Sequence, residues 1–213
     1  MEFEEFKHKI VKIKKMKLPG ESAQFKMAPK ERIDELKKIA DVKKRAKKAG
    51  VLALFYPSVS KQTMFALILR KTYKGVHSAQ IGFPGGKFEA MDSSLRVTAL
   101  RETEEEIGVN QNKVIVLKKL TEVYIPPSNF FVQPFLGYTN KTPNFILQED
   151  EVEDLIEVPL KHFMNDSIKS FQNLSTSYAK NIEVPVFKLN NHRVWGATAM
   201  MLSEVREMLK QLL

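Results

Sequence analysis

Three glutamates near the middle of the chain have the spacing of one helix face: Glu102, Glu105 and Glu106. An α-helix turns by about 100° per residue, so these side chains fall within an arc of about 100°. Carboxylates so close together repel one another, and a divalent cation removes that repulsion. Magnesium prefers oxygen ligands and often joins a few carboxylates to substrate phosphates. The spacing therefore predicts a site for Mg²⁺, with Mn²⁺ as the alternative.

Two neighbouring features would complete such a site. Residues 82–86 are glycine-rich, so their backbone can approach a ligand closely and offer a carbonyl. Arg101 can pair with a glutamate and hold its rotamer, or contact a phosphate. Each feature alone is weak, because a glutamate-rich helix is usually a solvated face and a Gly-Gly pair is usually a turn. Their occurrence together and in this order makes the pattern specific.

The elements that must position these residues follow from capping and periodicity. Residues 93–107 read as a helix, because good capping residues precede it and Gly108 ends it. Strand-like segments surround the helix, and a second amphipathic helix closes the chain at 195–213. This order predicts an α+β fold or an α/β/α sandwich. The expected strands are 51–56, 63–70, 81–83, 114–117, 120–124, 130–138 and 151–158, with a hairpin formed by 167–177 and 182–188.

The N-terminal quarter differs from the rest in charge. Residues 1–50 hold 16 lysines and arginines against 8 aspartates and glutamates, so they carry most of the net charge of +9. We expect a basic helical extension at 1–49, with helices at 3–15 and 29–39, and one domain at 50–213. The extension either attracts anions or is simply a lysine-rich surface, and the second interpretation is favoured because interleaved aromatics and arginines are missing. We expect residues 1–17 to be dispensable for chemistry.

Composition excludes several classes of site. The chain has no cysteine, which rules out disulfides, thiolate zinc sites and a cysteine nucleophile, and its four histidines disfavour a histidine-rich metal site. No signal peptide and no apolar run of about 20 residues is visible, so a cytoplasmic enzyme or binding protein is expected.

Residues 101–109 resemble the core of the Nudix box, Arg-Glu-U-x-Glu-Glu-x-Gly-U with U aliphatic, and depart from it only at Thr103. If Gly86 is the box glycine and Asp92 replaces its first glutamate, the spacer before Arg101 is one residue longer than usual. That longer spacer resembles the coenzyme A pyrophosphatase branch of the family, whose box reads Gly-Gly-x-x-Asp-x-x-Asp before Thr-Ala-Leu-Arg-Glu.

Other segments resemble the same branch, and the likeness spans about residues 50–200. The branch carries a Leu-x-x-Arg element and a His-x-Gly-Gln-x-x-Phe-Pro-Gly-Gly element, which are similar to residues 67–70 and 77–86, with Ala79 in place of a glycine. Further similar segments are 126–130, 151–152 and 194–199.

The resemblance implies a Nudix α/β/α sandwich with a mixed β-sheet. It also implies hydrolysis of a nucleoside diphosphate linked to another group. The substrate would be coenzyme A or acyl-CoA, cut to 4′-phosphopantetheine and adenosine 3′,5′-bisphosphate. Glu102 and Glu106 would be the main metal ligands, together with the carbonyl of Gly86. Glu105 would be a third ligand or a water-orienting base, and Arg101 would orient the glutamates.

Substrate contacts are expected outside the box. Arg70 and Lys87 flank the glycine-rich loop and are candidates for holding phosphates. His77 is either a substrate contact or structural, and Glu151 is a candidate for a further acid or base. Trp195 is assigned to the core rather than to ligand stacking.

Two alternatives stay open at this point. The box handles only the pyrophosphate, so the substrate could instead be a sugar nucleotide or a dinucleoside polyphosphate. A Nudix domain that only senses a nucleotide is the alternative from another class, and the three retained glutamates argue against it. The expected partner is a small nucleotide, not a membrane or a nucleic acid, and a homodimer is left open.

Overall fold

A computed structural model describes residues 1–29, 33, 46–72, 80–174 and 182–213. Its centre is an eight-stranded sheet with the path β3-β2-β1-β7-β5, to which β4, β6 and β8 add at β1, β7 and β2. The pair β1·β7 is parallel and the other pairs are antiparallel, so the sheet is mixed. The strands are β1 (Lys47–Pro57), β2 (Thr63–Arg70), β3 (Ile81–Gly82), β4 (Gly85–Lys87), β5 (Val114–Lys119), β6 (Val123–Ile125), β7 (Phe130–Thr139) and β8 (Val152–Pro159).

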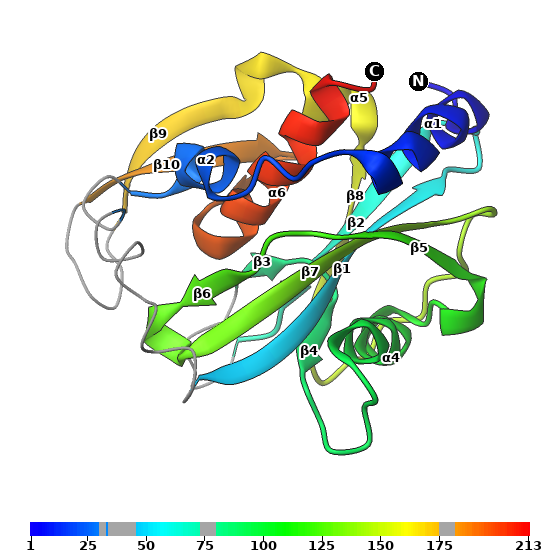
Figure 1. Ribbon diagram of the computed structural model, residues 1–213, viewed down its shortest axis with the longest axis horizontal. Helices are drawn as coiled ribbons and strands as arrows, with labels where there is room; N and C mark the ends of the chain where they lie inside the picture. Colours follow the sequence, from blue (N-terminus) through cyan, green and yellow to red (C-terminus); the bar gives the residue numbers. More distant parts are fainter. Residues whose placement is uncertain (30–32, 34–45, 73–79, 175–181) are drawn as a thin grey trace.

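Helices cover both faces of this sheet, as Figure 1 shows: α4 lies on one side, and α1 and α6 lie on the other. A smaller sheet with the order β11-β10-β9 stands beside α6. The predicted α/β/α sandwich is therefore confirmed. The remaining elements are α1 (Phe3–Ile10), α2 (Glu21–Gln24), α4 (Leu95–Ile107), α5 (Leu160–Met164), β9 (Lys169–Leu174), β10 (Ile182–Leu189), β11 (His192–Val194) and α6 (Gly196–Lys210), with short 3-10 turns at Val11–Lys15, Phe25–Met27, Gln111–Lys113, Pro126–Ser128 and Asp166–Ile168.

Most sequence-based boundaries hold to within a few residues. The hairpin expected from 167–177 and 182–188 is the antiparallel pair β9·β10, with residues 175–177 outside the described residues. The strand expected at 120–124 is wrong in its first half, because β6 begins only at Val123. The backbone N–H of Thr121 donates to the buried carboxylate of Glu204 on α6 instead of to a neighbouring strand. The helix expected at 29–39 lies, apart from residues 29 and 33, outside the described residues.

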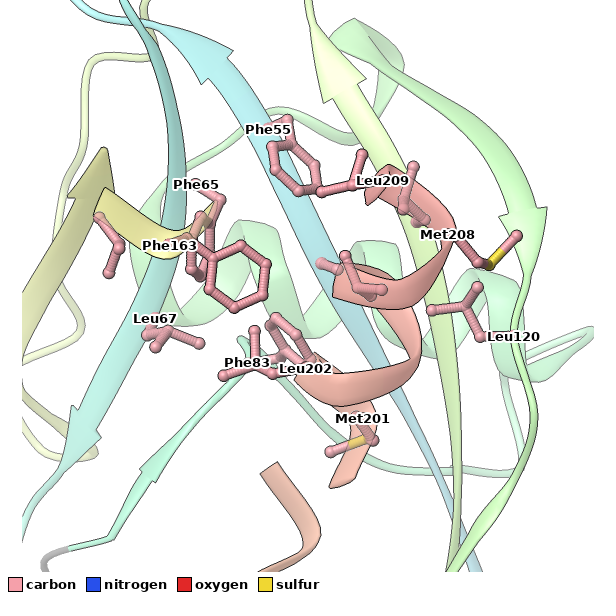
Figure 2. Close-up of a cluster of buried hydrophobic side chains, with 14 of the residues drawn as sticks. Phe55, Phe65, Leu67, Phe83, Leu120, Phe163, Met201, Leu202, Met208 and Leu209 are labelled. Carbon is pink, nitrogen blue, oxygen red and sulfur yellow. The ribbon is translucent and has the colours of Figure 1, made fainter. Parts of the chain in front are cut away.

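The larger hydrophobic core fills the space between the sheet and α6, and Figure 2 shows part of it. Phe55 and Phe65 point from β1 and β2 toward Leu202 and Leu209 of α6, while Phe163 closes the side. A second core cluster packs between the other face of the sheet and α4. Since both faces are buried, the central strands are apolar along most of their length, as a covered sheet requires.

The first helix belongs to the larger core. The predicted helix at 3–15 is α1 followed by a 3-10 turn, and its apolar side chains Phe3, Phe6, Ile10 and Ile13 are all buried. The Phe6 ring lies 5.0 Å from that of Phe55, measured between centroids. Beyond α1, Glu204 accepts hydrogen bonds from Gly20 N–H and the Gln24 side chain.

The N-terminal segment is thus fastened to the body by apolar and polar contacts. The division between an extension at 1–49 and a domain at 50–213 stays a prediction. β1 begins at Lys47, before the predicted boundary, and α1 packs into the core of the body. Within the described residues, no helix is both long and apolar enough to span a bilayer.

We expect Phe6→Ala to lower the free energy of unfolding by about 3–5 kcal/mol, because it leaves a cavity beside Phe55 in a fully buried site. Chemical denaturation followed by circular dichroism measures the loss. Val11→Ala, an exposed apolar position in the following turn, is the matched control, with an expected change within about 0.5 kcal/mol. If the two variants lost the same free energy of unfolding, the buried face of α1 would not contribute to the stability of the core.

Candidate active site

Helix α4 carries the glutamates and lies close against β1. Ser94 caps its start by accepting a hydrogen bond from Val97 N–H, and Gly108 ends it with a φ of 71°. A Cβ at Gly50 of β1 would stand 2.2 Å from the Leu95 carbonyl oxygen, so only glycine allows this close approach. Thr103, the departure from the box, is buried and donates its hydroxyl hydrogen to the Ala99 carbonyl at 2.6 Å. The hydroxyl is therefore satisfied within the helix.

Glu102 lies directly over the glycine-rich strand β4. A Cβ at Gly86 would be 2.1 Å from Glu102 Oε2, so the carboxylate occupies the space that any other side chain would fill. The Glu102 side chain is 15% exposed. Burial raises the pKa of this carboxyl, while Arg101 acts in the opposite direction and the charges of Glu105 and Glu151 raise it further.

Glu106 is the more deeply placed carboxylate, with only 2% of its side chain exposed. Its Oε2 accepts a hydrogen bond of 2.7 Å from Gly85 N–H. Arg70 Nη1 lies 2.9 Å from Glu106 Oε1 and forms an ion pair with it. Oε1 nevertheless has no hydrogen-bond partner among the described residues. Burial raises the pKa of Glu106 to about 7, although Arg70 and the Gly85 bond lower it. The charges of Glu102 and Glu151 add to the rise.

Arg101 joins the box residues into one network. It binds Asp92 through two hydrogen bonds of 3.0 and 3.1 Å, and donates to Glu102 at 3.0 Å and to Glu105 at 2.7 Å. The Asp92 side chain is 1% exposed and also accepts from Thr98 Oγ1. The bonds from Arg101 lower the pKa of Asp92 to about 2. The sequence analysis placed Asp92 at the position of the first glutamate of the box, and the structure shows that it anchors Arg101.

The other candidate residues differ in whether they reach the site. Arg70 reaches the site and donates from Nη2 to the Gly85 carbonyl at 2.7 Å. Lys87 is exposed at the end of β4, and its carbonyl accepts from Arg101. Glu105 is 55% exposed and turned toward Arg101. His77 lies outside the described residues.

Glu151 and Trp195 are the remaining candidates from the sequence. Glu151 is exposed, and its charge acts on both Glu102 and Glu106, so the loop before β8 brings it near them. Trp195 is partly buried at the start of α6, between a core position and the surface.

The donor set fits a divalent cation. Within the described ranges, no three carboxylate or imidazole side chains form a ready cage for a metal ion. Magnesium does not require one, since it keeps several waters and uses one or two carboxylates with substrate phosphates. Glu102 and Glu106 supply two carboxylates with raised pKa, and Glu106 Oε1 is buried without a hydrogen bond. Such a pair gains from a nearby cation.

We expect Asp92→Asn to lower the free energy of unfolding at neutral pH, because the buried Asp92–Arg101 pair is lost while the hydrogen bonds from Thr98 and Glu89 can persist. The pKa of Asp92 is lowered in the folded state, so its contribution is complete above about pH 4 and disappears as the pH falls toward 2. Denaturation curves of both proteins from pH 7 to pH 2 test this. Asp150→Asn, an exposed carboxylate, is the control. A deficit that stays constant with pH would contradict the assignment.

Several known proteins are similar in sequence. The peroxisomal coenzyme A diphosphatase ndx-8 of Caenorhabditis elegans is 29% identical over 178 residues, covering 80% of this chain and 74% of that protein. The mitochondrial coenzyme A diphosphatase NUDT8 of Homo sapiens is 32% identical over 127 residues, covering 59% of this chain and 54% of that protein. The uncharacterized Nudix hydrolase NudL of Yersinia enterocolitica is 31% identical over 156 residues, covering 73% and 79%.

Solved structures agree in fold at low sequence identity. A Nudix hydrolase from M. Smegmatis, RenU, has a TM-score of 0.54 and 13% identity, covering 79% of this chain and 88% of that chain. A MutT/nudix family protein from Enterococcus faecalis has a TM-score of 0.52 and 16% identity, covering 78% and 63%. The sequence profile of the NUDIX domain matches residues 46–175, a range that holds the whole central sheet and α4 with its glutamates. Because the matched range is more than half of the chain and contains the carboxylate site, this chain belongs to the Nudix family of hydrolases.

Proposed function

We propose that this Nudix hydrolase cleaves the pyrophosphate of coenzyme A or acyl-CoA in a reaction that depends on Mg²⁺ or Mn²⁺. The observation that carries the proposal is the buried carboxylate pair of Glu102 and Glu106 beside the β4 backbone. The two relatives named coenzyme A diphosphatases support the substrate class. A cytoplasmic location remains a proposal, since those two relatives are named peroxisomal and mitochondrial.

In this proposal Glu102, Glu106 and the Gly86 carbonyl would hold the cation, with Glu105 as a third ligand or a water-orienting base. When bound, the cation neutralises charge on the bridging and leaving phosphate oxygens and helps a water to attack phosphorus in line. Arg101, held by Asp92, fixes the rotamer of Glu102 from a distance of 3.0 Å. A ligand fixed before binding loses less conformational entropy when the cation arrives.

A base that orients the attacking water must lie near Glu102 and Glu106, and its own carboxylate must not be engaged by another residue. Glu105 is one candidate for this role, but its exposed carboxylate forms an ion pair with Arg101. Glu151 is exposed on the loop before β8 and acts electrostatically on both ligands. We therefore keep both residues as candidates, with Glu151 favoured because Arg101 does not bind it.

The phosphates of the substrate would be held by Arg70 and Lys87. Arg70 forms an ion pair with Glu106 and donates to the Gly85 carbonyl. A cation at Glu106 would compensate the negative charge in place of Arg70. The guanidinium would then be available to bind two oxygens of a phosphate in a bidentate manner. Lys87 is exposed beside the same strand and offers a second positive charge.

We expect Glu106→Gln to lower kcat by a factor of about 100 or more, since one buried ligand charge at the developing negative charge is worth several kcal/mol. The variant should remain folded by circular dichroism, and excess chelator should abolish activity in the native enzyme. Steady-state hydrolysis with Mg²⁺ and with Mn²⁺ measures both effects. Glu104→Gln on the same helix is the control. Full activity of Glu106→Gln, or activity that survives the chelator, would refute the metal assignment.

The substrate is tested with coenzyme A and its 3′-dephospho form, in the native enzyme and in Arg70→Ala. A charge-assisted phosphate contact is worth on the order of 1.5–3 kcal/mol, so its loss should weaken binding roughly ten- to a hundredfold. Hydrolysis of sugar nucleotides or dinucleoside polyphosphates, but not of coenzyme A, would reject the branch while leaving the Nudix chemistry intact. Unchanged kinetics in Arg70→Ala would reject its phosphate contact.

A further inference from the structure

An open pocket of about 420 Å³ lies between α5 and the smaller sheet, away from the glutamates of α4. Its lining includes His162 of α5, Gln172 of β9, and Lys188 and Arg193 of the β10–β11 hairpin. The hairpin meets β8 at Glu157, which pairs with Ala66 of β2, four residues from Arg70. At about 3.3 Å per residue, that offset is on the order of 13 Å along the strand. The pocket is therefore separate from the proposed catalytic site.

The pocket gathers positive charge without a balancing carboxylate. Lys188 and Arg193 are direct cross-strand partners in the β10·β11 register, and like charges in this arrangement repel each other. Within the part of the chain that the structure describes, neither has an ion-pair partner and no acidic side chain lines the pocket. Glu157, whose carbonyl touches the hairpin, directs its carboxylate to the Tyr56 hydroxyl, and Tyr56 packs in the core beneath α4.

The backbone geometry of the hairpin is fixed, so the exposed residues Lys188 and Arg193 stay side by side across the two strands. Asn190 and Asn191 form a two-residue turn with φ values of 45° and 65°, the left-handed conformation that favours asparagine in tight hairpins. The Asn190 side chain donates to the Glu157 carbonyl at 2.6 Å, and His162 Nε2 lies 3.2 Å from the Lys188 carbonyl oxygen. The turn is thus tied to β8 and to α5, which keeps the two cations on one side of the pocket.

We propose that this pocket binds a phosphate group, as inorganic phosphate or as a phosphate monoester. Arg193 supplies a planar fork that matches phosphate oxygens, and Lys188 adds a point charge. The side-chain amide of Gln172 and the imidazole of His192 provide further donors around the same space. A bound dianion removes the cross-strand repulsion, just as a cation removes that of the glutamates. This site is independent of the substrate proposed for the catalytic site.

The test is NMR titration of the full-length protein with inorganic phosphate, without divalent metal and at constant ionic strength. We expect saturable shift changes at residues 188–193 and at His162. The double variant Lys188→Ala/Arg193→Ala should weaken binding tenfold or more, since two charge-assisted contacts are lost. Lys113→Ala/Lys141→Ala removes the same charge from exposed positions elsewhere and should leave the affinity unchanged.

Additional measurements separate the outcomes. Equal affinity for phosphate and AMP identifies the phosphate group alone as the ligand, and tighter binding of AMP identifies a nucleotide monoester. Arg193→Gln, a milder change, gives an independent value if the double variant unfolds, and should also bind more weakly. Shifts that do not saturate, that chloride reproduces, or that persist unchanged in the folded variants would overturn the proposal.

Discussion

The carboxylate of Glu106, buried between α4 and the backbone of β4, is the constraint on which the site depends. An isolated buried carboxylate is costly, so the surroundings must supply either a proton or positive charge. Here the Gly85 N–H and the Arg70 guanidinium supply part of the positive charge, and the pKa of Glu106 is still raised to about 7. The charge of Glu106 is therefore only partly compensated, and a cation would complete the compensation. The contacts of Glu106 also bring the glycine-rich loop, β2 and α4 together at one site.

Close packing of backbone on backbone makes that burial feasible. Gly50 lets α4 lie against β1, and Gly86 gives the Glu102 carboxylate its space over β4. Asp92 then holds Arg101, which in turn holds Glu102 and Glu105. The glutamates are thus fixed from two sides, by the sheet below and by an arginine that is itself anchored. A site preorganised in this way does not have to order its ligands when a cation binds.

The N-terminal segment takes part in the same architecture from the other face. α1 covers the sheet opposite α4, and Glu204 of α6 fastens the segment after it to the loop before β6. The sheet that supports α4 is therefore covered by apolar side chains on both faces. A lysine-rich composition in this segment coexists with a buried apolar stripe, because long charged side chains occupy only its outer positions.

The sequence alone determined the helix of the glutamates, its caps, its family and the order of most strands, because these depend on local spacing and on a motif of fixed length. Tertiary structure alone decided that Asp92 anchors Arg101, that Arg70 forms an ion pair with Glu106, and that Glu105 faces solvent while Glu106 is buried. It also decided that Thr121 donates to Glu204 instead of to a strand, and that α1 belongs to the core. These features join residues far apart in the chain or depend on how deeply one helix face sinks into the sheet, and periodicity carries neither kind of information.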